Sequence, residues 1–160
     1  MKLLKIGNAI LTAVIRNILG GIILFSSLLL FVNVVMRYVF LAPIFWAEEL
    51  ARYLMVWMIF LGAGLLAGEE GHISVNAITR FLTPRSNLML SRIVRVVGLI
   101  FCIVLTWYGW KHAMSVRNSL QVTAALDIPM WLTYLAIPVG GAIMVLRYAT
   151  HLGPRKDPEE

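Results

Sequence analysis

The side chains most able to do chemistry flank one long apolar segment, residues 46–68. They are Glu48, Glu49, Arg52, Glu69, Glu70 and His72. As a helix the segment reaches roughly 34 Å at about 1.5 Å per residue, enough to cross a hydrocarbon core of about 30 Å. Carboxylates in a membrane either serve ion or proton transfer or pair with cations of neighbouring helices. These acids lie near the membrane edges, which favours pairing over a central proton relay.

Two pairings are open for the acids at the start of this segment. Glu48 and Arg52 are four residues apart with the acid first, the favourable order for an ion pair within a helix. In that case Glu49 meets water. Alternatively Glu49, which shares a helix face with Trp57, reaches a cation on another helix, and Arg37 of this chain is a candidate. On this second interpretation Glu49 matters more for assembly than Glu48.

The acids at the other end, Glu69 and Glu70, stand at the negative end of the helix dipole and therefore call for a nearby cation. Three arginines of the next apolar segment share one helix face in the same leaflet: Arg85, Arg92 and Arg95. They either bind anionic lipid headgroups or form salt bridges with the acids. We assign them to the headgroups.

Enzymatic, haem and metal chemistry find no support in the pattern of reactive side chains. His72 and His112 fall at opposite ends of their segments and His151 in the tail, so no two face one iron. The single Cys102 excludes an internal disulfide and a Cys-x-x-Cys motif. No glycine-rich nucleotide loop and no Ser/His/Asp arrangement can be assembled. We predict a protein that is not an enzyme and holds no cofactor or metal.

The composition places these residues in a membrane. The chain is 60% hydrophobic and only 14% charged, and its mean hydropathy is +0.84. Four apolar segments are long enough to span, at about residues 17–37, 46–69, 88–111 and 128–148. We predict an all-α integral membrane protein, one domain over residues 1–160, with four transmembrane helices. A short amphipathic helix at about residues 74–82 lies in the membrane interface.

The distribution of basic residues sets the orientation. With the N-terminus inside, ten of the 14 Lys and Arg residues fall in inner segments and four in outer ones. This positive-inside bias predicts that both termini are cytoplasmic. Four of the five tryptophans lie at the outer ends of the segments, where aromatic rings settle at headgroup level.

Small residues and prolines predict local packing. Gly64 and Gly68 form a GxxxG pattern, which lets two helix backbones approach closely. Pro138 removes a backbone donor from the fourth span and predicts a bend there. Asp127 is expected to cap the start of that span.

Charged helix ends and close-packing glycines are typical of a subunit that binds another membrane protein. We assign the following residues to a partner-subunit interface: Arg37, Glu48, Glu49, Arg52, Trp57, Gly64, Gly68, Glu69 and Glu70. No mid-membrane polar cluster provides a substrate site in this chain.

Several short motifs along the chain are similar to those of one family, the small membrane subunits (DctQ or SiaQ type) of tripartite ATP-independent periplasmic, or TRAP, transporters. They occur in the family's order over nearly the whole chain. The motifs are NVVMRYVF at residues 33–40, FWAEELARY at 45–53, FLGA at 60–63, GHISV at 71–75 and IPMWLTYLAIPVG at 128–140.

The resemblance implies a division of labour. A large membrane subunit would hold the sodium and substrate sites and move as an elevator, and a periplasmic binding protein would deliver an organic acid such as a sialic acid or a dicarboxylate. The small subunit would be the fixed scaffold and part of the docking surface, in the bacterial inner membrane. Two other classes stay open: a self-sufficient homodimeric multidrug-type transporter, and a membrane anchor of a redox complex.

Overall fold

The computed structural model describes residues 2–67 and 84–150, with the backbone alone for residues 2–6, 84–92 and 150. The helices are α1 (Lys2–Tyr38), α2 (Ala47–Leu66), α4 (Pro84–Asn118), α5 (Trp131–Tyr134) and α6 (Ala136–Thr150). Four stretches are long and apolar enough to cross a membrane, namely Gly7–Tyr38, Ala47–Leu66, Ile93–Asn118 and Trp131–Ala149. The predicted all-α membrane fold is confirmed. The interfacial helix predicted at residues 74–82 lies outside the described residues.

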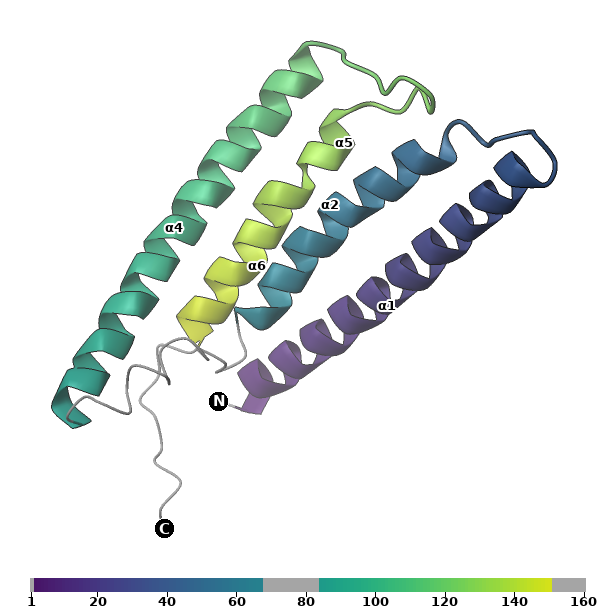
Figure 1. Ribbon diagram of the computed structural model, residues 1–160. Helices are drawn as coiled ribbons and strands as arrows, with labels where there is room; N and C mark the ends of the chain where they lie inside the picture. The colour runs from purple at the N-terminus through teal and green to yellow at the C-terminus, as the bar shows by residue number, and fades with distance from the viewer. Residues whose placement is uncertain (1, 68–83, 151–160) are drawn as a thin grey trace.

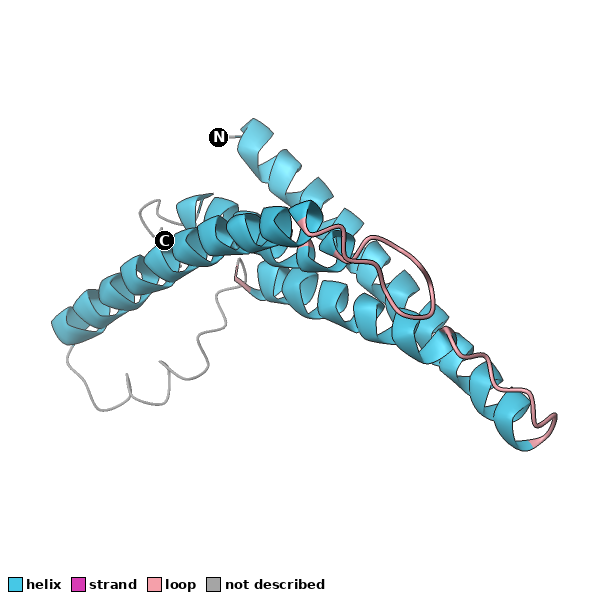
Figure 2. Cartoon of the chain, turned by 90° about the horizontal axis from the view of Figure 1, so that it is seen from above, coloured by secondary structure: helices cyan, strands magenta, loops and turns pink. Residues whose placement is uncertain are grey.

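The helices form a row. α4 packs on α6, α6 packs on α2, and α2 packs on α1, so α6 lies between α4 and α2 while α1 and α4 form the two edges (Figure 1). The two described connections, residues 39–46 and 119–130, join the helices at the same end of their long axes (Figures 1 and 2). We call this the loop-bearing end. α1 and α4 have 37 and 35 residues and therefore exceed the length that a hydrocarbon core requires.

This arrangement gives the chain little interior. The fully buried apolar side chains are few and small, and many large ones on both edges are exposed. In water such a surface would be a liability, but in a bilayer lipid tails are as apolar as leucine. The helices therefore hold together through close backbone approach and a small number of polar contacts.

Two adjacent glycines fix α6 between its neighbours. A Cβ built at Gly140 would lie 2.7 Å from both the Cβ and the carbonyl oxygen of Phe60 in α2. A Cβ at Gly141 would lie 2.5 Å from Thr106 Oγ1 in α4. Because successive helical residues point about 100° apart, Gly140 brings α6 against α2 and Gly141 brings it against α4.

The last span is interrupted near Pro138. α5 ends at Tyr134, and α6 begins at Ala136. Proline has no N–H to donate to the carbonyl four residues earlier, which belongs to Tyr134. The ladder resumes where the N–H of Val139 donates to the carbonyl of Leu135 at 3.1 Å. The predicted disturbance at Pro138 is therefore present as a break in the helix.

The expected cap at Asp127 is wrong. Asp127 is exposed, has φ 51° and stands within the connection at residues 119–130. The first helical residue is Trp131, and Met130 occupies the cap position without a side-chain hydrogen bond. The span starts later than residue 128 because the preceding residues fold back as a loop.

Candidate functional site at the loop-bearing end

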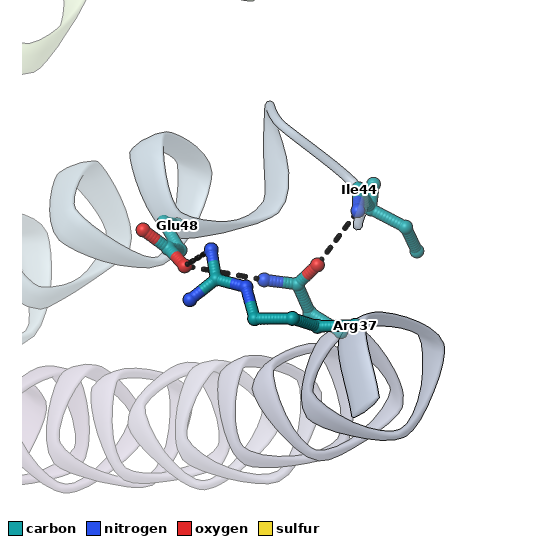
Figure 3. A network of polar contacts seen from close by, with 4 residues as sticks. Arg37, Ile44 and Glu48 are labelled. Atoms are coloured by element: carbon teal, nitrogen blue, oxygen red, sulfur yellow. Dashed lines mark hydrogen bonds and ion pairs between the residues drawn. The ribbon is translucent and has the colours of Figure 1, made fainter. Parts of the chain in front are cut away.

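A polar network joins α1, α2 and the connection between them (Figure 3). Glu48 Oε1 accepts a hydrogen bond from Arg37 Nη2 at 2.7 Å and a longer one from Asn33 Nδ2 at 3.5 Å. The Oδ1 atom of Asn33 accepts a hydrogen bond from the N–H of Ile44 at 2.8 Å. One asparagine thus ties the second helix and its preceding loop to the end of α1.

The ion pair and the asparagine of this network contribute differently to stability. The side chains of Arg37 and Glu48 are 48% and 50% exposed, and an ion pair this exposed contributes less than about 1 kcal/mol. Asn33 is only 3% exposed and lies in a membrane-spanning helix, where a polar group without a partner is costly. Asn33 therefore holds the loop in place, while the ion pair between Arg37 and Glu48 adds only a weak contact between α1 and α2.

Neither pairing predicted within this chain is present, while a cation on a partner helix for Glu49 stays a prediction. Arg37 meets Glu48, and Glu48 does not pair with Arg52, which is exposed. Glu49 does not reach Arg37 either. The reason is the rotation of α2, which turns Glu48 toward α1 and Glu49, about 100° further round, toward the connection at residues 119–130.

Glu49 instead binds backbone N–H groups of that connection. Its Oε1 accepts from Ala124 N at 3.1 Å, and its Oε2 accepts from Ala125 N at 2.7 Å. The hydroxyl of Tyr53, one turn along α2, also donates to Oε1. A carboxylate that accepts backbone N–H bonds is a strong acceptor, because the charge assists each bond. Glu49 therefore fixes a loop that lies far away in sequence.

The loop itself is closed by Thr123, which is only 1% exposed. Its N–H donates to the carbonyl of Ile128 at 2.9 Å, and its Oγ1 accepts from the N–H of Ile128 at 3.1 Å. Just outside this pair, Met130 N donates to the carbonyl of Gln121. Residues 119–130 therefore have a defined shape, and they present Leu120 to the outside at 85% exposure.

A second network lies at the other end of the helices, away from the loop-bearing end. It surrounds Arg147 of α6, which is 2% exposed. Its Nη1 donates to the carbonyl of Leu65 near the end of α2 at 2.9 Å. Its Nη2 donates to Thr12 Oγ1 of α1 at 2.7 Å, and that hydroxyl donates in turn to the carbonyl of Asn8. One arginine therefore joins three helices. The sequence pattern marks Arg147 only as one of the inner positive charges.

The structure locates the remaining predicted interface residues unevenly. Trp57 is half-buried on α2, and Gly64 is buried, with Ile143 of α6 2.9 Å from a Cβ built on it. Gly64 thus packs inside the chain. Arg95 is half-buried on α4. The others lie outside the described residues or in the part of α4 described by backbone alone: Gly68, Glu69, Glu70, Arg85 and Arg92.

The acids of the described part all lie at the loop-bearing end, namely Glu48, Glu49 and Asp127. Within residues 2–67 and 84–150 no carboxylate stands in the middle of a span, and no group of three side chains could hold a metal ion. The hydrogen bonds of Glu48 and Glu49 thus position loops.

Residues 26–153 match the family described as tripartite ATP-independent periplasmic transporters, DctQ component. A TRAP transporter small permease protein of Haemophilus influenzae is 33% identical over 133 residues, 82% of this chain and 81% of that one. The C4-dicarboxylate TRAP transporter small permease protein of Rhodobacter capsulatus is 27% identical over 103 residues, 64% of this chain and 45% of that one.

A third relative is much longer. The isethionate TRAP transporter permease protein of Oleidesulfovibrio alaskensis is 26% identical over 102 residues, which make up 64% of this chain and 16% of that one. Members of this family are components of a transporter and not enzymes. Membership implies a large permease subunit as partner. By these matches, and by its four membrane-spanning helices, the chain belongs to the DctQ family of small permease subunits of TRAP transporters.

Proposed function

We propose that this chain is the fixed, non-transporting subunit of a sodium-coupled TRAP transporter for an organic acid in the bacterial inner membrane. The observation that carries the proposal is the placement of the acids at one end of the helix row. A coupling ion or an organic anion needs polar ligands near the membrane midplane. In the described spans no acid lies there to bind the coupling ion, and we assign the sodium and substrate sites to the large subunit.

The packing supports a scaffold role. Gly140 and Gly141 hold α6 at backbone distance from both neighbours, so the row behaves as one rigid unit against which a large subunit moves as an elevator. Neither a homodimeric multidrug-type transporter nor a redox anchor is favoured, because the first needs a mid-span carboxylate and the second needs paired histidines.

The loop-bearing end supports a docking role. The distribution of Lys and Arg favours cytoplasmic termini, and with that orientation the loop-bearing end is periplasmic. Glu49 and Thr123 give the connection at residues 119–130 a defined shape before any partner arrives. A preformed surface binds with a smaller loss of conformational freedom. We therefore place part of the contact with the periplasmic substrate-binding protein there.

The substrate class follows from the relatives. Two of them are named for C4-dicarboxylate and for isethionate, both of which are organic anions. A sialic acid is a third candidate from the sequence motifs. Because the small subunit holds no site for the anion, the choice among them lies with the large subunit and the binding protein.

Reconstitution tests the proposed division of labour. Proteoliposomes that contain this chain alone are expected to show no sodium-dependent uptake of radiolabelled dicarboxylate or sialate. Adding the cognate large permease and binding protein should restore uptake with at least one of the acids. Uptake by the small subunit alone would refute the scaffold role.

Cysteine accessibility tests the orientation. In a Cys102→Ala background, Leu120→Cys should react with a membrane-impermeant maleimide added to intact spheroplasts, because Leu120 is exposed at the loop-bearing end. Asn76→Cys should react only after the membrane is opened. The reverse pattern would place the loop-bearing end in the cytoplasm.

Paired variants test the role of Glu49. Glu49→Gln replaces one acceptor oxygen by an NH₂ group, so Ala124 and Ala125 can no longer both be satisfied. Loss of a charge-assisted hydrogen bond costs about 1.5–3 kcal/mol. We expect the amides of Ala124 and Ala125 to exchange at least tenfold faster and the binding protein to bind several-fold more weakly.

Glu48→Gln is the matched control, since its remaining carbonyl still accepts from Arg37 at a half-exposed position. Hydrogen exchange and binding-protein affinity are compared for both variants in nanodiscs that contain the complete complex. If the two variants behave alike, Glu49 does not control the loop.

A further inference from the structure

An apolar groove of about 700 Å³ runs between α4 and α6. It is lined by residues that include Thr106, Trp107 and Trp110 of α4 and Pro138, Val139 and Ala142 of α6. All of these residues lie in stretches that are apolar enough to cross a membrane. The groove therefore opens toward the bilayer and not toward water.

The helix contact that borders the groove has a fixed shape. Gly109 of α4 meets Ile137 of α6, where an added Cβ would lie 2.7 Å from the Ile137 Cγ2 atom. Nearer the middle of the span, Gly141 meets Thr106. The two helices thus touch at two levels through glycine. The groove above these contacts is a built surface, not a loose gap.

The walls are apolar and uneven in height. The hydroxyl of Thr106 donates to the carbonyl of Cys102 at 2.7 Å, so it needs no bond from an occupant. On α6 the wall is low at Val139 and Ala142 and rises at Leu146, which is 58% exposed, while on α4 it is formed by Trp107 and Trp110, which are 66% and 53% exposed. Short side chains beside large ones are what a ridge of another helix packs into.

The length of the groove also suits a helix. Its α4 wall runs from Ile103 to Trp110, about 10 Å at about 1.5 Å per residue, or two helical turns. A flexible acyl chain adapts to any apolar surface. The short side chains of Val139 and Ala142 instead permit the close backbone approach by which helices associate in lipid.

The identity of the occupant follows from the place of α6 in the row. Its two flanks are taken by α2 and α4, so only its two faces are free for a partner, and the groove lies on one of them. The family implies a large permease partner, and in the isethionate relative the matching residues make up only 16% of one longer permease chain. The large permease is thus the membrane partner that the family provides for this face.

We propose that one apolar transmembrane helix of the large permease subunit lies in the α4–α6 groove and packs on Val139 and Ala142. The inference rests on the proposed scaffold function and names the surface that performs it. The groove lies around the middle of the two membrane-crossing stretches, since its lining runs from Ile103 to Trp110 within Ile93–Asn118 and from Pro138 to Leu146 within Trp131–Ala149.

Filling the groove tests the proposal. Ala142→Trp adds bulk on an exposed position and should lower co-purification of the cognate large permease with the tagged small subunit at least tenfold. Ala13→Trp, on the exposed side of α1, is the matched control and should co-purify as the native chain does. Equal recovery with both variants would overturn the groove assignment.

A second measurement covers the case in which Ala142→Trp fails to fold. A photo-crosslinking amino acid at Val139, in the otherwise native complex in membranes, should form an adduct with the large permease. An adduct with a second copy of this chain, an adduct with phospholipid alone, or no adduct overturns the proposal. If the native chain itself fails to co-purify with the permease, the scaffold function fails; if only the Ala142 and Val139 results fail, the groove assignment alone is lost.

Discussion

Gly140→Ala is expected to destabilise the isolated subunit by about 2 kcal/mol. The new methyl group would lie 2.7 Å from the carbonyl oxygen of Phe60 and 2.9 Å from its carbonyl carbon. Those atoms belong to the backbone of α2 and cannot turn away as a side chain can. The two helices must therefore separate, and overpacking of this kind costs about 1–3 kcal/mol.

Gly62→Ala is the matched control, because a Cβ at Gly62 meets nothing within 4 Å. Alanine is about 1 kcal/mol better than glycine in a helix, so this variant should be neutral or slightly more stable. The measurement is the midpoint of SDS-induced unfolding in mixed micelles. Equal midpoints for the two variants would show that α2 and α6 do not touch at Gly140.

Arg147→Met is expected to cost a similar amount, about 2 kcal/mol, for a different reason. Methionine preserves most of the volume but leaves the carbonyl of Leu65 without its donor and removes the link to Thr12. Loss of hydrogen bonds to a charged group costs about 1.5–3 kcal/mol. The positive charge also lies beside the C-terminal end of α2, where the helix dipole is negative.

Two further variants separate the hydrogen bonds of Arg147 from its charge. Arg147→Lys keeps the charge but not the planar fork that reaches two helices at once, so it should recover only part of the loss. Arg16→Met removes an exposed arginine of α1 and should change the unfolding midpoint little. A midpoint for Arg147→Met as high as that of Arg16→Met would contradict the three-helix contact.

The sequence predicts the helices because their signals are local. Apolar length gives the four spans, and the missing donor of Pro138 acts on a carbonyl only four residues away. The small size of the residues in a GxxxG pattern is also a local property, and Gly64 does pack closely against another helix. What the pattern does not contain is the identity of the facing helix, which here is α6 of the same chain and not a partner.

The side-chain pairings at the candidate site depend on segments far apart in the chain, and sequence patterns do not predict them. Whether Glu48 or Glu49 meets Arg37 is decided by the rotation of α2, which depends on the path of the loop that Asn33 holds. The acceptor role of Glu49 depends on N–H groups 75 and 76 residues further along the chain. No local rule relates those positions.

The cap at Asp127 fails for a related reason. An acid just before an apolar run is the usual sign of a helix start. Here Thr123 and Ile128 pair with each other first, and this closed loop delays the helix to Trp131. The burial of Arg147 is likewise invisible in sequence, because Leu65 and Thr12 reach it only when three helices have assembled.

The row arrangement has a consequence for the life of the chain in the cell. A subunit with so little interior gains much of its stability from whatever covers its faces, and a partner that binds only the folded form stabilises it by mass action. We therefore expect its abundance to be coupled to that of its partner. Chains made in excess should unfold more often and be removed by membrane proteases, so that quality control contributes to the subunit ratio.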